Sequence, residues 1–154
     1  MKVSDILESG TIVLDIEAGE KQELIKRLVN ELRSSVDETL VPEIKKLVIE
    51  REDVMSTGVG KGIAIPHAKV PGIENHLCVF ARLKNPIEFG SVDGEPVHLV
   101  FLLVGGHQKA GIHIKLLSKI SRLLNHDNFR NQLLKASDEK SVIDLFREEE
   151  ELPA

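Results

Sequence analysis

Two strongly apolar segments lie in the middle of the chain, residues 77–83 (LCVFARL) and residues 97–104 (VHLVFLLV). Short apolar runs that are bounded by turn-forming residues are typical of strands buried inside a sheet. Such residues follow the first segment at Asn85-Pro86, where we predict a turn, and precede the second at residues 92–96. We therefore predict that these two segments are the central strands of a sheet, against which the rest of the chain has to pack.

Other elements are predicted on both sides of these strands, because apolar residues recur there at the spacing of a strand or of a helix. The predicted helix that ends with Arg51 in its last turn has Pro42 near its start, where a missing N–H group costs nothing. Helices that alternate with strands and are followed by a helical C-terminus indicate an α/β fold, in which helices cover a sheet. The predicted elements are a strand at residues 11–16, helices at residues 19–34, at residues 41–53 and from residue 112 onward, and short helical runs at residues 129–135 and 141–147, the last with Ser137 as its N-cap.

The composition is that of an ordinary globular domain. The chain has 154 residues, of which 42% are hydrophobic and 29% are charged, and we predict that residues 1–154 form a single domain. The longest apolar run, residues 99–104, is too short to span a bilayer, and the first residues lack the apolar stretch of a secretory signal. The lone Cys78 cannot form an internal disulfide, and we expect it to be a buried small side chain. Together, these features predict a cytoplasmic protein that does not insert into the membrane. Residues 148–154, which begin with four glutamates, are expected to be a frayed, solvated tail.

Charge and motifs argue against several classes of function. A formal net charge of −5 and the absence of Trp and Tyr disfavour nucleic-acid binding, which needs clustered basic residues and aromatic platforms. Nucleotides are not predicted either, since the glycine-rich segment lacks the Ser or Thr of a P-loop and has Ile63 where a dinucleotide fingerprint needs glycine. A metal site built from His67, His107 and His113 has no His-Glu-x-x-His pattern or cysteine pair to support it. We predict no cofactor and no metal.

A glycine-rich segment with the sequence STGVGKGIAIPHA occupies residues 56–68. Its glycines permit backbone conformations that other residues avoid, and Pro66 fixes its own φ angle. The histidine at the end of this loop, His67, is suited to chemistry because a neutral imidazole is nucleophilic near neutral pH. From these residues alone we interpret His67 as a nucleophile that accepts a transferable group, with phosphoryl as the leading candidate.

This segment resembles the active-site segment of the type 2 EIIA domains of the bacterial phosphoenolpyruvate-dependent phosphotransferase system (PTS). These are the fructose/mannitol-type IIA domains, and they include the nitrogen-regulatory IIA proteins. Three further segments carry the resemblance: residues 50–52 (ERE) as the family's Arg-Glu pair, Phe89 with residues 93–97 (DGEPV) as its middle segment, and residues 113–120 (HIKLLSKI) as the helix of its second histidine. The similarity extends from about Val3 to Leu145. It implies a mixed β-sheet flanked by α-helices, the fold of the mannitol/fructose-type IIA domains.

The resemblance implies that His67 is the phosphoryl acceptor, and it suggests roles for neighbouring residues. Phosphoryl transfer is catalysed largely by positioning and by charges that meet the transferring oxygens. His113 matches the second active-site histidine and could hydrogen-bond the phosphoryl oxygens or hold the ring of His67, while Arg51 could bind phosphate bidentately. As phosphate-binding groups we predict the hydroxyls of Ser56 and Thr57 and the backbone N–H groups of Gly58 and Gly60.

The function predicted by these residues is that of a phosphocarrier. His67 would take a phosphoryl group from a small HPr-like protein and pass it to a IIB component of a sugar uptake system of the fructose or mannitol type, or its phosphorylation would control binding to a regulated protein, as in the nitrogen branch. The surroundings of His67 should then be a docking face, for which Ile63, Ile65 and Val70 are the candidate exposed apolar residues. Two alternatives stay open: a regulatory binding module that uses the same face without obligatory phosphotransfer, and a metal-dependent hydrolase.

Overall fold

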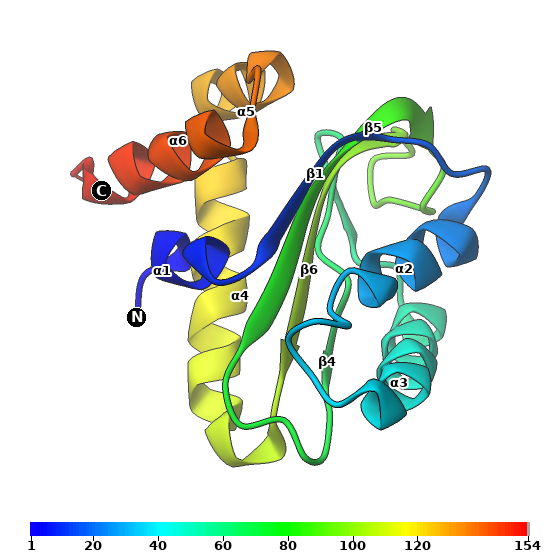
Figure 1. Cartoon of the computed structure of the whole chain (residues 1–154). Coiled ribbons are helices and arrows are strands. Elements are labelled where there is room, and N and C mark those ends of the chain that lie inside the picture. The colour runs from blue at the N-terminus through cyan, green and yellow to red at the C-terminus, as the bar shows by residue number, and fades with distance from the viewer. Residues whose placement is uncertain (154) are drawn as a thin grey trace.

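A mixed β-sheet forms the middle layer of the molecule, and helices cover both of its faces (Figure 1). The computed structural model describes residues 1–153. Within that range the strands are β1 (Thr11–Ile16), β2 (Gly58–Gly60), β3 (Ile63–Ala64), β4 (His67–Lys69), β5 (Leu77–Ile87) and β6 (Val97–Gly105). They form one sheet in the order β1-β5-β6-β3-β2, and β4 also pairs with β6. The predicted α/β fold with a mixed sheet between helices is confirmed.

The helices form two groups, one on each face of the sheet. Helices α2 and α3 pack on one face, and α1, α4, α5 and α6 pack on the other (Figure 1). Each group buries an apolar core against the sheet, and none of the helices in residues 1–153 is both long and apolar enough to cross a bilayer. Their bounds are α1 (Val3–Glu8), α2 (Lys21–Asn30), α3 (Val41–Val54), α4 (Ala110–Leu124), α5 (Asp127–Lys135) and α6 (Glu139–Glu151), with the short 3₁₀ helices η1 (Glu38–Leu40) and η2 (His107–Lys109).

Strands β5 and β6 lie at the centre of the sheet, as their apolar sequences predict. They are antiparallel, whereas β1 is parallel to β5, and β3 and β4 are parallel to β6. The predicted turn at Asn85-Pro86 is wrong, because β5 continues to Ile87. The pairing of β5 with β6 shifts register between Arg82 and Ile87, and such an irregularity is where a strand can accommodate a proline, which has no N–H to donate.

The glycine-rich segment, expected to be a loop, folds into the three short strands β2, β3 and β4. Strands β2 and β3 form a hairpin whose two turn residues, Lys61 and Gly62, have φ angles of 58° and 80°. Positive φ at both positions is what a tight type I′ turn requires, and it suits glycine best. At the less favourable position, the backbone N–H of Lys61 donates to Oδ2 of Asp93 at 2.9 Å. The hairpin therefore attaches the segment to the sheet edge and delivers His67 to the start of β4.

Helix boundaries differ from prediction where the end of a helix depends on tertiary contacts. Helix α2 ends at Asn30 and not near Ser34, and the chain continues there in tight turns. The N-cap of α6 is Asp138, whose carboxylate accepts from the backbone N–H of Ser141, and not Ser137. Asp138 directly follows Ser137 in the sequence and has the extended backbone conformation of an N-cap residue.

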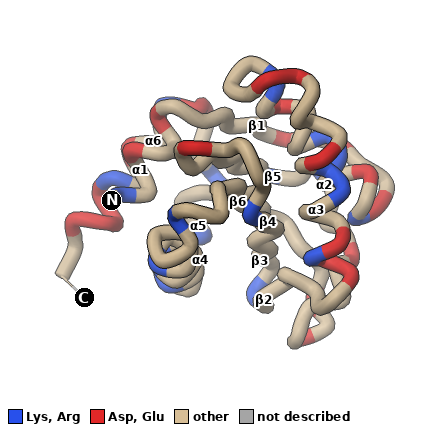
Figure 2. Tube along the Cα trace, turned by 90° about the horizontal axis from the view of Figure 1, so that it is seen from below, with Lys and Arg blue, Asp and Glu red and all other residues tan. Residues whose placement is uncertain are grey.

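Residues 148–151 are not the frayed tail that we expected, because helix α6 continues to Glu151. The carboxylate of Glu150 accepts hydrogen bonds from the backbone N–H groups of Val3 at 2.6 Å and Ser4 at 2.8 Å. These N–H groups belong to the first turn of α1, where they have no acceptor within their own helix. Figure 2 shows the acidic residues of α6 beside α1 and the N-terminus. These hydrogen bonds hold helix α6 against the start of helix α1.

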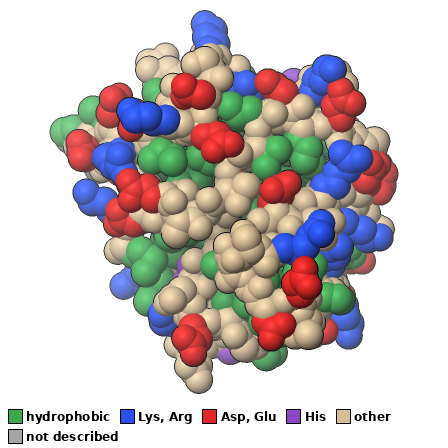
Figure 3. All heavy atoms as spheres, in the orientation of Figure 1, with side chains coloured by type: hydrophobic (Ala, Val, Ile, Leu, Met, Phe, Trp, Pro, Cys, Tyr) green, Lys and Arg blue, Asp and Glu red, His purple; other side chains and the backbone are tan. Residues whose placement is uncertain are grey.

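The surface is charged with both signs. On the face drawn in Figure 3, basic and acidic side chains are interspersed, with hydrophobic side chains between them. Neither sign of charge dominates the part of the surface seen there.

Candidate active site

His67 is held with one defined ring nitrogen free for chemistry. It is the first residue of β4, lies beside Leu103 of β6, and is half-buried. Its Nδ1 is 2.8 Å from the carbonyl oxygen of Ile65. A carbonyl oxygen can only accept, so Nδ1 carries the proton, and the lone pair of the neutral ring is on Nε2. Of the two ring nitrogens of His67, Nε2 is therefore the one that could act as a nucleophile.

The surroundings of His67 favour the neutral ring. Burial lowers the pKa of His67 below its ordinary value, and the positive charge of Arg51 acts in the same direction. The hydrogen bond to Ile65 and the negative charge of Glu52 oppose these effects without reversing them. Because only the neutral ring has a lone pair, this balance keeps Nε2 nucleophilic at neutral pH.

Two clefts open beside His67, and Arg51 and His67 line both of them. The first has a volume of about 460 Å³ and is also lined by His113, and the second has a volume of about 510 Å³ and is also lined by Thr57. Arg51 is in the last turn of α3, where Nη1 donates to the carbonyl oxygen of Met55 at 2.9 Å. The fold thus brings together Arg51, His67 and His113, three residues that the sequence singled out from distant segments.

His113 is buried in the first turns of α4, with its ring centroid 5.7 Å from that of His67. Burial lowers the pKa of His113 to about 4, and the neighbouring His76, His67 and Lys69 contribute in the same direction. A neutral imidazole can donate a hydrogen bond from only one of its nitrogens. Nδ1 of His113 is 3.1 Å from Nε2 of His76, so Nε2 is the ring nitrogen of His113 that is left for other contacts.

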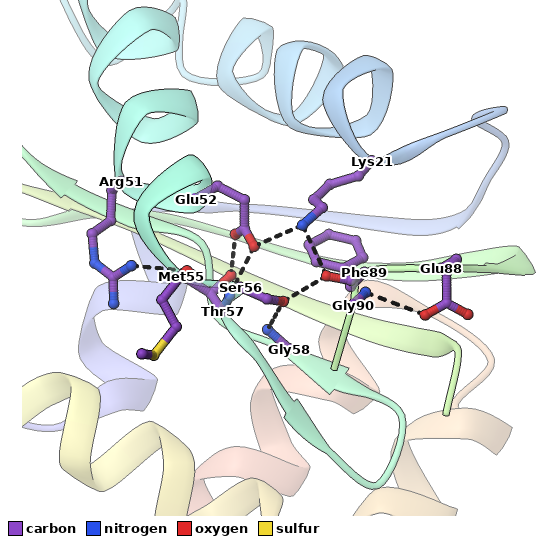
Figure 4. A network of polar contacts seen from close by, with 10 residues as sticks. All are labelled: Lys21, Arg51, Glu52, Met55, Ser56, Thr57, Gly58, Glu88, Phe89 and Gly90. Carbon is purple, nitrogen blue, oxygen red and sulfur yellow. Dashed lines mark hydrogen bonds and ion pairs between the residues drawn. The ribbon is translucent and has the colours of Figure 1, made fainter. Parts of the chain in front are cut away.

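A buried carboxylate, that of Glu52, organises the chain segment between α3 and β2 (Figure 4). It accepts hydrogen bonds from the backbone N–H of Thr57 at 2.8 Å, from the Thr57 hydroxyl, and from Nζ of Lys21 at 3.1 Å. Lys21 also donates to the carbonyl oxygen of Phe89 at 2.8 Å. The network ties α2, α3 and the start of the glycine-rich segment into one support behind the clefts.

The hydroxyls predicted to bind phosphate are engaged inside the protein. Thr57 donates to Glu52, and Ser56 donates to the carbonyl oxygen of Phe89 at 2.6 Å. The Ser56 hydroxyl also accepts from the backbone N–H of Gly58 at 3.0 Å, and Gly58 and Gly60 are in β2 (Figure 4). Ser56, Thr57 and Gly58 line the second cleft, but these contacts favour a part in holding the backbone rather than in contacting an anion.

The exposed apolar residues beside the site are not the ones we expected. Ile63, Ile65 and Val70 are buried, because β3 pairs with β6 and their side chains enter the two cores. Five other apolar side chains are exposed and line the two clefts: Val54, Met55, Val59, Val92 and Ile114. We call these five residues the apolar rim.

Two further expectations concern Cys78 and a metal site. Cys78 is fully buried, as expected, and burial raises the pKa of its thiol to about 12. The alternative metal site at His67, His107 and His113 has no counterpart in the geometry, since within residues 1–153 no three His, Cys, Asp or Glu side chains are arranged to hold a metal ion.

Sequence reasoning missed three features of this site: His76, the Glu52 network and the apolar rim. His76 has no motif around it, and it contacts His113, which is 37 residues away. A usable signal was present only for Glu52, which neighbours Arg51 in a pair that we had already singled out. The other two depend on contacts that no local pattern encodes.

Comparison with known proteins gives one consistent result. Residues 5–149 match the family model of the phosphoenolpyruvate-dependent sugar phosphotransferase system, EIIA 2. The chain is 36% identical over 148 residues to the PTS fructose-specific EIIABC component of Bacillus subtilis, covering 96% of this chain but only 23% of that protein. It is 33% identical over 148 residues to a nitrogen regulatory protein of Bradyrhizobium diazoefficiens, covering 95% of both chains. Its fold is similar to the crystal structure of the nitrogen regulatory protein IIA-Ntr from Neisseria meningitidis, with a TM-score of 0.84, 31% identity and coverage of 94% of this chain and 98% of that one.

Proposed function

The chain belongs to the EIIA type 2 family of the phosphoenolpyruvate-dependent sugar phosphotransferase system, and from this we propose that it is a phosphocarrier that holds a phosphoryl group on Nε2 of His67. The donor is the phosphohistidine of a small HPr-like protein, and the acceptor is a IIB component or a regulated protein. A cytoplasmic location is part of the proposal. The observation that carries it is the hydrogen bond from His67 Nδ1 to Ile65, which leaves Nε2 as the nucleophile beside Arg51 and His113.

The bonds formed and broken in the transfer step balance without a cofactor. The lone pair of His67 Nε2 attacks the phosphorus atom, a new N–P bond forms, and the N–P bond to the donor histidine breaks with its electron pair returning to the donor ring. The Nδ1 proton of His67 stays in its hydrogen bond to Ile65 throughout. Because no proton has to enter or leave the pair of rings, positioning and charge are what the protein must supply.

Arg51 and His113 are the groups that we propose for those tasks. Arg51 lines both clefts with His67, and a guanidinium has five N–H groups in a planar fork that matches phosphoryl oxygens. His113 lines the first cleft and is neutral at physiological pH, so it can donate one hydrogen bond. We assign Ser56, Thr57, Gly58 and Gly60 to the support of the segment, in line with their internal contacts.

The apolar rim is the proposed docking surface. Val92 and Ile114 are 83% and 66% exposed, and exposed apolar side chains around a cleft are typical of sites where another protein binds. A phosphocarrier must release each partner after transfer, which calls for a small contact area. The fructose-specific relative, which is named as an EIIABC component, has A, B and C parts in one protein, and this supports a IIB component as one acceptor.

The test is transfer from a defined donor. The purified chain is incubated with phosphoenolpyruvate, enzyme I and an HPr-like protein, and intact mass and peptide analysis locate acid-labile phosphate. We expect one phosphoryl group on His67, none in His67→Ala, and an unchanged yield in His98→Ala, which removes an exposed histidine of β6. Full labelling of folded His67→Ala would refute the proposal.

A regulatory role is the second candidate, and it is favoured by the relatives named nitrogen regulatory protein, one of which matches along 95% of both chains. In this form the phosphoryl group on His67 changes which partner binds to the apolar rim. Pull-downs with phosphorylated and unphosphorylated protein separate the possibilities. A bound partner that is indifferent to the state of His67 would point instead to a binding module that does not depend on phosphotransfer.

A further inference from the structure

A third histidine, His76, lies directly behind the site and has no role in the function proposed above. It is buried, in the segment that leads into β5. Its Nε2 is 3.1 Å from Nδ1 of His113, while the two ring centroids are 5.2 Å apart and the ring planes are inclined by 25°. The two nitrogens therefore lie between the centroids, on the facing edges of the two rings. This is the geometry of an N–H···N hydrogen bond, because both the N–H bond and the accepting lone pair lie in the ring planes.

The backbone of β6 makes room for this contact. Gly105 is the last residue of β6, and a Cβ atom at this position would lie 2.3 Å from Nε2 of His76. No side chain fits there without displacing His76. The absence of a side chain at Gly105 is thus what allows the His76 ring to reach His113.

One hydrogen bond between two neutral imidazoles permits two arrangements of protons. In the first, His76 donates from Nε2, and the proton of His113 is on Nε2. In the second, His113 donates from Nδ1, and its Nε2 has a bare lone pair. Within the described residues, Nε2 of His113 and Nδ1 of His76 are both buried and have no hydrogen-bond partner in the protein. Of the two rings, that of His113 lines the cleft beside His67.

A phosphoryl group on His67 distinguishes the two arrangements. Its oxygens are acceptors, so a bare lone pair on His113 would repel them, whereas an N–H group would bind them. The neutral state of His113, which follows from its low pKa, means that it cannot donate from both nitrogens at once. A neutral His113 can serve the phosphoryl group only in the tautomer that carries the proton on Nε2, and a donor to its Nδ1 favours that tautomer.

We propose that His76 is a positioning residue of the phosphotransfer site: it donates from Nε2 to Nδ1 of His113 and thereby fixes the proton of His113 on Nε2, where it can bind the phosphoryl group. This inference rests on the proposed function, since it needs a phosphoryl group on His67. His76 itself stays behind His113 and does not contact that group.

Two variants of matched length separate the hydrogen bond from simple packing. Glutamine in His76→Gln carries an N–H group at about the distance of Nε2, and methionine in His76→Met fills similar space without a donor. The tautomer of His113 is read from the ring ¹⁵N chemical shifts of histidine-labelled protein, with its signals assigned by their absence from His113→Gln. The rate of phosphoryl uptake from the HPr-like donor is measured on the same samples, and the dispersion of backbone amide signals reports folding.

We expect the proton of His113 on Nε2 in the wild type and in His76→Gln, and a mixture of tautomers in His76→Met. Phosphoryl uptake should fall by about tenfold or more in His76→Met, by analogy with metal-bound histidines that lose their orienting partner, and His76→Gln should recover most of it. The inference alone is overturned if a phosphorylated wild type has the His113 proton on Nδ1, or if folded His76→Met keeps the wild-type rate. A wild type that takes up no phosphoryl group would overturn the proposed function and this inference together.

Discussion

The buried contact between Thr57 and Glu52 should contribute measurably to stability, and Thr57→Val tests it. Thr57 is 5% exposed, and its hydroxyl donates to a carboxylate that is itself 5% exposed. Valine has nearly the same shape but no hydroxyl. The backbone N–H of Thr57 and the Lys21 ammonium keep their bonds to Glu52 in this variant (Figure 4), so the substitution removes one hydrogen bond and leaves the charge of Glu52 paired.

The expected magnitude follows from two opposing effects. A hydrogen bond to a charged group contributes about 1.5–3 kcal/mol, and its loss leaves a carboxylate oxygen short of a donor. The methyl group that replaces the hydroxyl is buried, and this returns about 0.8 kcal/mol. The free energy of unfolding should therefore fall by about 1–2 kcal/mol. For a chain of this size each kcal/mol lowers Tm by about 2–4 °C.

The assay is urea unfolding followed by circular dichroism at pH 7, with thermal unfolding as a second measure. Thr11→Val is the matched control, because its hydroxyl makes an exposed and long contact of 3.4 Å to the carbonyl oxygen of Glu31. The control should stay within about 0.5 kcal/mol of the wild type. If Thr57→Val is as stable as the wild type with an unchanged denaturant slope, the bond from the Thr57 hydroxyl to Glu52 does not stabilise the protein, and the reasoning is refuted.

Three further outcomes are expected. Ile114→Glu, in the apolar rim, should weaken binding of the HPr-like donor by about fivefold or more and raise KM without lowering Tm. Leu134→Glu, an equally polar change at an exposed site of α5, should alter neither binding nor Tm. Equal effects of the two substitutions would show that the apolar rim is not the docking surface. The pKa of His113 is about 4 in the folded protein against an ordinary 6.5, so the unfolded chain binds this proton first as the pH falls. The His113 contribution to the free energy of unfolding is therefore complete above about pH 7, and up to about 3 kcal/mol of it should be lost as the pH falls toward 4. Urea titrations should show a smaller decline in His113→Asn, and an equal decline would assign the effect to other groups. Since burial raises the pKa of Cys78 to about 12, its thiol should react with a disulfide reagent only as fast as the protein unfolds, and rapid labelling of the native protein would contradict its burial.

Local sequence patterns were sufficient to predict a strand or helix wherever its structure depends on its own composition. The apolar runs of β5 and β6 predict central strands because their side chains need burial on both faces of the sheet. The periodic helices α2, α3 and α4 were found in the same way. Helix α1, with six residues, is too short to show a period, and the strands β2, β3 and β4 are two or three residues each, so they form only because a neighbouring strand pairs with them.

The sequence by itself singled out the residues that we propose for the chemistry, because His67, Arg51 and His113 stand in three segments that resemble those of the family, and the fold brings them to one pair of clefts. Only the tertiary structure decided how those groups are supported. The link from His76 to His113 spans 37 residues, and that from Glu150 to Val3 spans 147. The physical reason is that a hydrogen bond or a buried surface depends on where two segments meet in space. Residue type and spacing fix the preferences of each segment, but which nitrogen of His67 is free and which side chains remain exposed are settled when the segments pack.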